Sequence, residues 1–301
     1  VEQAGIPPGV VNIVTGHGHP VGHELTKHPL VRRVAFTGGP ETARTIVRNS
    51  AENFASLSLE LGGKSPQIVF PDADLDSAVN GIIGGIFGAS GQSCVAGSRL
   101  YAQREIYDDL IERLVDRTKS IRLGSPLDPD SEMGPLATSE QLERFESYVT
   151  ATPTEGGRVL VGGQRPTKPS EGWFVEPTIL ETHAEGVRAQ SDEIFGPVLA
   201  VTTFDSEAEA IKKANASQYG LAAGVWTSAV DRAHRLIRSL SAGIVWVNTY
   251  RATSPVAPFG GLRDSGGGRE SGADAVYDYT SVKTAWINSS NQEVSDPFKV
   301  Q

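Results

Sequence analysis

The chain has 301 residues, 39% of them hydrophobic and 21% charged, a composition typical of a globular protein large enough for two domains. Its formal net charge of -9 and the lack of a basic run argue against a nucleic-acid partner, and no apolar run reaches the length of a membrane span. A single cysteine cannot form an internal disulfide, which favours a reducing compartment such as the cytoplasm.

The chain begins without a methionine, and Gly5 is typical of the residue that ends a helix. We therefore expect further residues of the same domain upstream of Val1. Pro8–Gly9 leads into VVNIV at 10–14, whose apolar run predicts a buried strand.

Four histidines follow this run, but no nearby cysteine or carboxylate completes a zinc-binding pattern. They are His17, His19, His23 and His28. We expect a solvated loop here and no metal site.

VRRVAF at 31–36 predicts a second strand, and the glycine pair Gly38–Gly39 comes just after it. Pro40 is suited to the first position of a helix, because its missing N–H would have no intrahelical partner there. A glycine turn that opens a helix presents free N–H groups and a positive dipole end, which favours a phosphate-binding site.

The segment ASLSLELGGK at 55–64 alternates with a strict period of two. Leu57, Leu59 and Leu61 share one face of the predicted strand, and the opposite face carries Glu60 at the strand's end. Taken alone, such a glutamate would be a solvated surface residue. The glycines that follow would allow backbone or ligand to approach closely.

IVF at 68–70 predicts the next strand, followed by a helix with apolar residues at 75, 78, 79, 82, 83, 86 and 87, the spacing of one buried face. The helix should end near Ala89 and place Cys94 on the turn beyond it. Small residues surround this cysteine on both sides, which would leave its thiol accessible. Taken alone, Cys94 would be a small buried hydrophobic residue.

The later part of the chain predicts further alternation of strands and helices. Ser206 and Glu209 form a capping box ahead of a helix that ends near Asn215. Strands are expected at 221–227 and 243–248 with a helix between them, and glycines make 251–274 the most loop-like region. Repeated β–α–β units favour parallel α/β sheets.

Six stretches together resemble, in order, the motifs of the aldehyde dehydrogenase superfamily, and they cover essentially the whole chain. They are FTGGPETAR at 36–44, LELGGKSP at 59–66, GQSCVAGSR at 91–99, EIFGPV at 193–198, YGLAAGVWT at 219–227 and PFGGLRDSGGGRE at 258–270. The resemblance implies an α/β protein with part of a Rossmann-like NAD(P)-binding domain at 1–61. It also implies a parallel-sheet catalytic domain at 62–265 and a C-terminal return segment at 266–301 with an oligomerisation strand at 281–288.

The resemblance further implies the NAD(P)-dependent oxidation of a small-molecule aldehyde to a carboxylic acid. Cys94 would be the nucleophile that forms a thiohemiacetal and then a thioester, and Glu60 the base that activates water to hydrolyse it. An oxyanion-donating asparagine of the family would lie upstream of Val1.

The resemblance also implies the remaining contacts of the site. Residues expected to bind NAD or NADP are Gly38, Gly39, Leu61, Glu193 and Phe195. Residues expected to line the aldehyde pocket are Ser93, Tyr250 and Phe259. A homodimer or homotetramer is expected.

Two other functions are compatible with parts of the sequence. A cysteine hydrolase would need Cys94 to be activated by His183 or His234, and it would leave Glu60, Glu193 and the glycine turn unexplained. A non-enzymatic binding or structural role would leave the Cys94–Glu60 pair without a purpose. Aldehyde-dependent reduction of NAD(P) separates these alternatives from a dehydrogenase.

Overall fold

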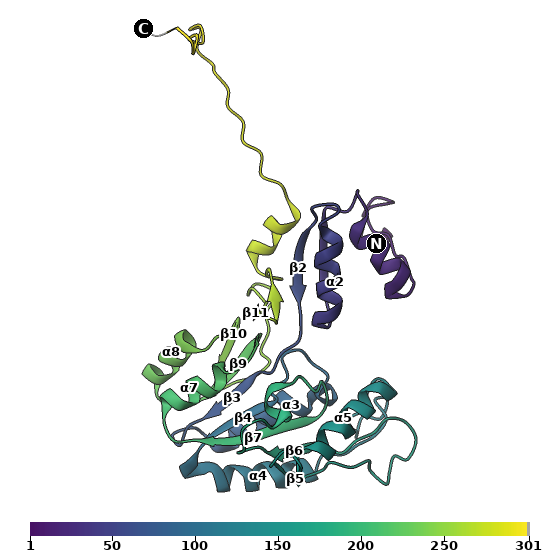
Figure 1. The fold of residues 1–301 in the computed structure, drawn as a ribbon, viewed down its shortest axis with the longest axis vertical. Helices are drawn as coiled ribbons and strands as arrows, with labels where there is room; N and C mark the ends of the chain where they lie inside the picture. The colour runs from purple at the N-terminus through teal and green to yellow at the C-terminus, as the bar shows by residue number, and fades with distance from the viewer. Residues whose placement is uncertain (300–301) are drawn as a thin grey trace.

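A computed structural model describes residues 1–299 (Figure 1). Its centre is a seven-stranded sheet in the order β10-β9-β3-β4-β7-β6-β5, in which every neighbouring pair is parallel except β5 with β6. The strands are β3 Pro66–Val69, β4 Arg99–Gln103, β5 Arg158–Val161, β6 Thr178–Glu181, β7 Val198–Phe204, β9 Ala222–Trp226 and β10 Ile244–Val247. The prediction of parallel α/β units is confirmed.

Helices cover both faces of this sheet. On one face α3 (Leu75–Phe87) and α4 (Tyr107–Lys119) bury their apolar sides against β-strand residues such as Leu100 and Val201. The other face is covered by α5 (Ser139–Ala151), α7 (Glu207–Asn215) and α8 (Val230–Ser239). The short helix α6 (Arg188–Ser191) precedes β7. The apolar spacing that predicted the helix at 75–87 therefore marks a face that is buried in the core.

A smaller sheet lies beside the large one (Figure 1). In it β1 (Arg33–Thr37) pairs in parallel with β2 (Ser56–Glu60), and β12 (Gly266–Gly267) adds to β2 in the antiparallel sense. The helix α2 (Pro40–Ser50) lies alongside β2 in Figure 1, and α1 (His23–Lys27) packs on α2. Pro40 is the first residue of α2, as predicted, with Gly39 as its N-cap.

The carboxyl ends of the strands in the small sheet lie close to the amino ends of the strands in the large sheet. The carboxyl ends of β1 and β2 lead to Gly38 and Glu60, and the five residues after Glu60 lead directly into the amino end of β3. Cys94 lies in the segment before β4, which is the neighbour of β3, and Glu193 lies in the segment before β7, which is the neighbour of β4. Chain topology thus brings the carboxyl edge of the small sheet to the amino edge of the large one.

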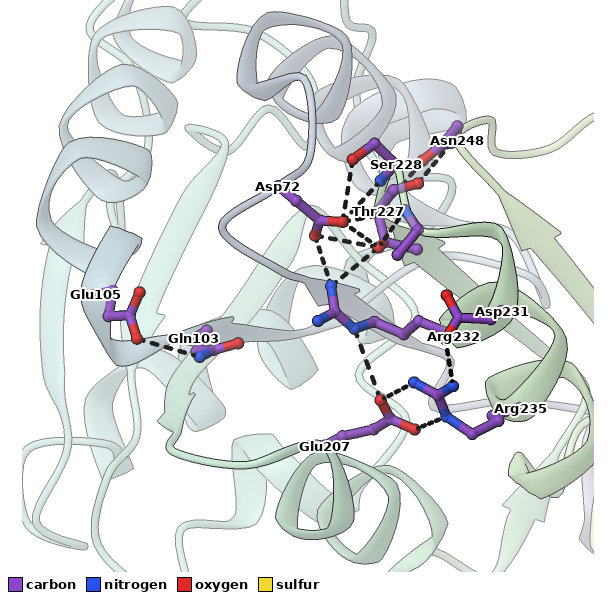
Figure 2. Close-up of polar contacts among 11 residues, drawn as sticks. Asp72, Gln103, Glu105, Glu207, Thr227, Ser228, Asp231, Arg232, Arg235 and Asn248 are labelled. Carbon is purple, nitrogen blue, oxygen red and sulfur yellow. Dashed lines mark hydrogen bonds and ion pairs between the residues drawn. The ribbon is translucent and has the colours of Figure 1, made fainter.

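The opposite edge of the large sheet is tied together by a polar network around Asp72, which follows β3 (Figure 2). Its carboxylate accepts hydrogen bonds from the Thr227 hydroxyl at 2.8 Å and the Ala229 N–H at 3.0 Å, and it pairs with Arg232 at 2.6 Å. Asn248, after β10, joins Thr227 through both its amide oxygen and its amide nitrogen. The ends of three strands are therefore linked to the start of α8.

Two of the expected strands do not form within the chain. The side chains at 10–14 are exposed, with Ile13 at 88%, and no strand of the described chain lies beside this run. Residues 281–288 are extended but unpaired, and Figure 1 shows the segment leaving the body of the molecule. Strand hydrogen bonds need a neighbouring strand, which an apolar sequence cannot supply by itself.

The capping box is only half formed. The Ser206 hydroxyl accepts from the Glu209 N–H at 3.3 Å, whereas the Glu209 carboxylate accepts from the N–H of Asp205 at 2.8 Å. The region 251–274 is largely loop, as expected. It contains the two-residue strands β11 (Leu262–Arg263), which pairs with β8 (Tyr219–Gly220), and β12.

Candidate active site

Cys94 lies on a turn that follows α3 and a short left-handed segment. Its small neighbours have a packing role that the sequence did not reveal. A Cβ at Gly91 would lie 2.2 Å from the Gly196 carbonyl oxygen, and one at Gly63 would lie 2.6 Å from the Cys94 carbonyl oxygen. Glycine at these positions lets three backbone segments close around the thiol.

The thiol is half-buried, and burial raises its pKa above the ordinary value. The N–H of Val95 lowers the pKa by hydrogen bonding to the sulfur, whereas the carboxylates of Glu193 and Glu60 raise it. The resting group is therefore a thiol that needs a proton acceptor or a bound cation before it becomes a nucleophile.

Glu60 occupies the last position of β2 and is only 3% exposed. Neither carboxylate oxygen has a hydrogen-bond partner among the described residues. Burial, and next the carboxylate of Glu270, raise its pKa to about 7, while Arg269 acts in the opposite direction. The carboxylate thus titrates near neutral pH, where a general base is most effective.

Glu193 is held by the glycine turn that follows Glu60. Its Oε1 accepts the N–H of Gly63 at 3.0 Å, and a Cβ at Gly62 would lie 1.9 Å from its Oε2. Burial raises the pKa of this carboxyl, and the Gly63 N–H and the charge of Lys64 lower it. Glycine at position 62 is therefore required for the carboxylate to reach this position, and the backbone of Gly63 supplies its hydrogen-bond donor.

One pocket of about 660 Å³ brings most of the predicted residues together. Its lining includes Cys94, Ser93, Glu60, Leu61, Gly38, Gly39, Glu193 and Phe195. Gly39 caps α2 without any side-chain hydrogen bond, so the first N–H groups of this 11-residue helix lack a side-chain cap at the pocket edge. A phosphate and a sugar diol would find donors at α2 and an acceptor at Glu193 there, so the residues fit a dinucleotide.

Five residues of the pocket lining were not predicted from the sequence, which are Thr37, Gly62, Gln92, Gln141 and Arg144. Gln141 and Arg144 project from α5, where Gln141 donates to the Ile194 carbonyl at 2.7 Å and Arg144 donates to the carbonyl of Glu193. They fix the backbone that carries Glu193 and Phe195. Only tertiary packing brings α5 here, so the spacing along the chain gave no signal for them.

Tyr250 and Phe259 do not line this pocket but pack beneath it. Both contact the apolar cluster that includes Trp246 and touches Cys94, and the Tyr250 hydroxyl donates to the Val95 carbonyl at 2.9 Å. Phe259 and Trp246 line a second cavity of about 230 Å³, together with the 252–258 loop. Of the expected aldehyde-pocket residues, Ser93 therefore lines the pocket of Cys94, Phe259 lines the second cavity, and Tyr250 lines neither.

The histidines do not form a second chemical centre. His183 bonds to the Thr202 hydroxyl at 3.1 Å, and neither it nor His234 lines the pocket of Cys94. Within residues 1–299 no cluster of three potential metal ligands occurs. The expected solvated loop is partly helical, because His23 opens α1 and contacts Asn49 at 3.0 Å. Neither His183 nor His234 is therefore placed to serve as the base of a cysteine hydrolase.

Comparison with known proteins agrees with this geometry. Residues 1–285 match the model of the aldehyde dehydrogenase family. The chain is 52% identical over 301 residues to (Z)-2-((N-methylformamido)methylene)-5-hydroxybutyrolactone dehydrogenase of Acinetobacter baylyi, covering 99% of this chain and 61% of that protein. It is 44% identical over 285 residues to betaine aldehyde dehydrogenase of Cereibacter sphaeroides, covering 95% and 58%.

A solved structure gives the same result. Betaine aldehyde dehydrogenase from Staphylococcus aureus, in complex with NAD+ and with a modified cysteine, superposes with a TM-score of 0.95 at 39% identity, covering 99% of this chain and 61% of that one. The chain thus spans about 60% of the length of the relatives it matches.

Proposed function

This chain belongs to the aldehyde dehydrogenase family, and from that premise we propose that it serves the NAD(P)-dependent oxidation of an aldehyde to a carboxylic acid. The observation that carries the proposal is one pocket that is lined by a thiol and two carboxylates, those of Cys94, Glu60 and Glu193. No helix in the described residues has the length and apolarity needed to cross a membrane.

Cys94 supplies the nucleophile. Its sulfur adds to the aldehyde carbon and forms a thiohemiacetal, while N–H groups of the surrounding turn stabilise the oxygen that gains charge. A nicotinamide cofactor, when bound, supplies a hydride acceptor. Loss of a hydride and a proton from the thiohemiacetal leaves a thioester on Cys94.

Glu60 supplies the base for the second half of the reaction. Its carboxylate removes a proton from water, and the hydroxide oxygen adds to the thioester carbon. The carbon–sulfur bond then breaks, which releases the carboxylic acid and restores the thiol. A pKa of about 7 leaves a substantial fraction of Glu60 ionised at neutral pH and therefore able to accept that proton.

The chain's own residues also position the cofactor. Gly39 and the first turn of α2 would offer backbone N–H groups to a diphosphate, and Glu193 would accept hydrogen bonds from ribose hydroxyls. The N–H of Gly38 already donates to the Glu60 carbonyl at 3.1 Å, so Gly38 would contribute by letting the cofactor approach the backbone closely. Phe195, which has a positive φ of 58° and is 41% exposed, would lie against the nicotinamide beside Leu61.

The substrate is proposed to be a small-molecule aldehyde that enters through the cavity beside Phe259. The lining of that cavity includes Trp246, Phe259 and two prolines, Ser93 lines the pocket of Cys94, and the Tyr250 hydroxyl supports the turn after Cys94 by donating to the Val95 carbonyl. The names of the two curated relatives, a hydroxybutyrolactone dehydrogenase and a betaine aldehyde dehydrogenase, suggest polar substrates as the first to be tested.

We further propose that residues 1–61 form a cofactor unit, 62–265 a catalytic unit and 266–301 a return segment that joins subunits in a homodimer or homotetramer. The free thiol of Cys94 suits a reducing compartment such as the cytoplasm.

The test is to mix the purified protein with an aldehyde and NAD or NADP and to follow absorbance at the reduced-nicotinamide band. A parallel assay measures hydrolysis of an added thioester without cofactor. Aldehyde-dependent reduction that Cys94→Ala abolishes supports the proposal. Thioester hydrolysis without any reduction would instead favour a cysteine hydrolase.

A further inference from the structure

Lys64 is the residue that directly follows the glycine turn of the site, and the mechanism above does not use it. Its side chain is 2% exposed, and its Nζ has no hydrogen-bond partner among residues 1–299. A lysine is rarely buried without a partner, because desolvation of the ammonium is costly. A functional role for Lys64 would explain why the fold accepts the desolvation of this ammonium.

The cavity beside Lys64 is too small for anything beyond one water molecule. Its volume is about 10 Å³, and its lining includes Arg99, Asn215 and Tyr219. The guanidinium of Arg99 cannot accept a hydrogen bond from the ammonium, and it donates to the Lys64 carbonyl at 2.7 Å and to the Ala214 carbonyl at the end of α7 at 2.8 Å. Arg99 therefore offers Lys64 only repulsion.

Two carboxylates act on Lys64 from the segment before β7. Asp192 is occupied, because it accepts hydrogen bonds from the Tyr148 hydroxyl and the Ser191 hydroxyl, each at 2.8 Å. Glu193 receives only the N–H of Gly63, the residue next to Lys64. Glu193 is thus the carboxylate that Lys64 is best placed to stabilise.

The directions in which Lys64 and Glu193 shift each other's pKa agree with this pairing. Burial, and next Arg99, lower the pKa of Lys64 to about 7, whereas Glu193 and Asp192 raise it. The pKa of Glu193 is in turn lowered by Lys64 and by Arg144 on α5, against burial. The Glu193 carboxylate also helps to raise the pKa of the Tyr219 hydroxyl on β8.

We propose that Lys64 is a positioning residue whose buried ammonium keeps the Glu193 carboxylate ionised behind the Gly62–Gly63 turn and ready to accept ribose hydroxyls. The inference rests on the proposed function, because it assigns Glu193 to the cofactor. Protonation of Glu193 would convert one of its acceptor oxygens into a donor and weaken that contact.

The test measures NADH binding by fluorescence between pH 5.5 and 8.5 for the wild type and for Lys64→Met. Without the ammonium, Glu193 becomes protonated at a higher pH, so the affinity of Lys64→Met for NADH should fall about tenfold at the acidic end. At pH 8.5 the two proteins should bind equally, because Lys64 is largely neutral there. In a Glu193→Gln background, Lys64→Met should not change the affinity for NADH at any pH in this range.

The melting temperature distinguishes a positioning lysine from a purely structural one, whose replacement would lower that temperature. Lys64→Met should raise the melting temperature, since it removes an unpartnered buried charge. Thr118→Val on α4, which also removes an unpartnered buried polar atom, is the matched control and should leave NADH binding unchanged at every pH.

A lower melting temperature together with a loss of affinity that is equal at all pH values would overturn the positioning role. NADH binding by Lys64→Met that matches the wild type at pH 5.5 would also overturn it. Wild-type protein that binds neither NADH nor NADPH would overturn the proposed function itself, and this inference with it.

Discussion

At the scale of single residues, the environment of Glu60 decides what it can do. The period-two pattern at 55–61 separated its two faces correctly but did not show which face is buried. Ser58 and Glu60 are buried, while Leu57 and Leu59 are only half-buried. Gly268, which lies 210 residues further along the chain, packs against Ser58, so the local sequence could not reveal that Ser58 is buried.

Burial of Glu60 predicts a pH-dependent gain in stability for Glu60→Gln. The folded pKa of about 7 exceeds the ordinary 4.5, so the folded state binds more protons between these values and loses stability as the pH rises through that window. The glutamine variant avoids this loss. Its free energy of unfolding should exceed that of the wild type by roughly 2–3 kcal/mol at pH 8 and by nothing at pH 4.

Urea unfolding at both pH values measures this difference. The exposed Glu52→Gln is the control and should show no gain at either pH. Equal stability of wild type and Glu60→Gln at pH 8 would mean that Glu60 is solvated in solution.

At the scale of elements, the sequence patterns located only part of the large sheet and its helices, and they did not identify β4, β5, β6, β7, α4 or α5 individually. The helix at 75–87 and the turn that carries Cys94 follow from apolar spacing and small residues. The run at 10–14 is not a strand because no neighbouring strand of the described chain lies beside it. The run at 281–288 is expected to pair with another chain, and this stays a prediction. Gln141 and Arg144 were missed for a related reason, since α5 reaches the site only through tertiary packing.

The turn before Cys94 predicts a stabilising substitution. Ala89 and Ser90 have φ values of 55° and 54°, a left-handed conformation that costs a residue with a Cβ about 1–2 kcal/mol. Ala89 is exposed, so Ala89→Gly removes this strain and should raise the free energy of unfolding by about 0.5–1 kcal/mol after the entropic cost of glycine. Ala51→Gly, at an exposed position with φ of -64°, should give no gain. A loss of stability in Ala89→Gly would contradict the left-handed turn.

The network at the far edge of the sheet (Figure 2) predicts a loss of stability that spares the site. Asp72→Ala leaves the N–H groups of Ser228 and Ala229, just before α8, and the Arg232 guanidinium without their acceptor, which should cost about 1–3 kcal/mol. The rate at which iodoacetamide labels Cys94 should not change. Asp76→Ala, which removes an 85% exposed partner of Arg113, should cost far less. Slower or faster labelling in Asp72→Ala would show that the two edges are coupled.

At the scale of the whole molecule, the run at 281–288 exposes large apolar side chains in the single chain. Val282, Trp286 and Ile287 are 92%, 94% and 86% exposed, along an extended run with unpaired backbone groups. Such a run favours pairing with another chain.

Light scattering after size exclusion should therefore show a dimer or tetramer at micromolar concentration. Trp286→Lys should reduce the molecular mass toward that of a monomer, whereas Leu127→Lys, at a 92% exposed loop position, should not. A wild type that is monomeric at this concentration would contradict the proposed subunit contact.

The central claim is that Cys94 carries the acyl group and Glu60 supplies the base that removes it. Glu60→Gln should still form the thioester, so a first-turnover burst of reduced nicotinamide should precede a steady state slowed by about 10²–10⁴-fold. Mass spectrometry of the protein quenched during that steady state measures the claim directly. The account predicts an acyl adduct of the substrate's mass on Cys94 in Glu60→Gln and little in the wild type. An unmodified Cys94 in the stalled variant would contradict it.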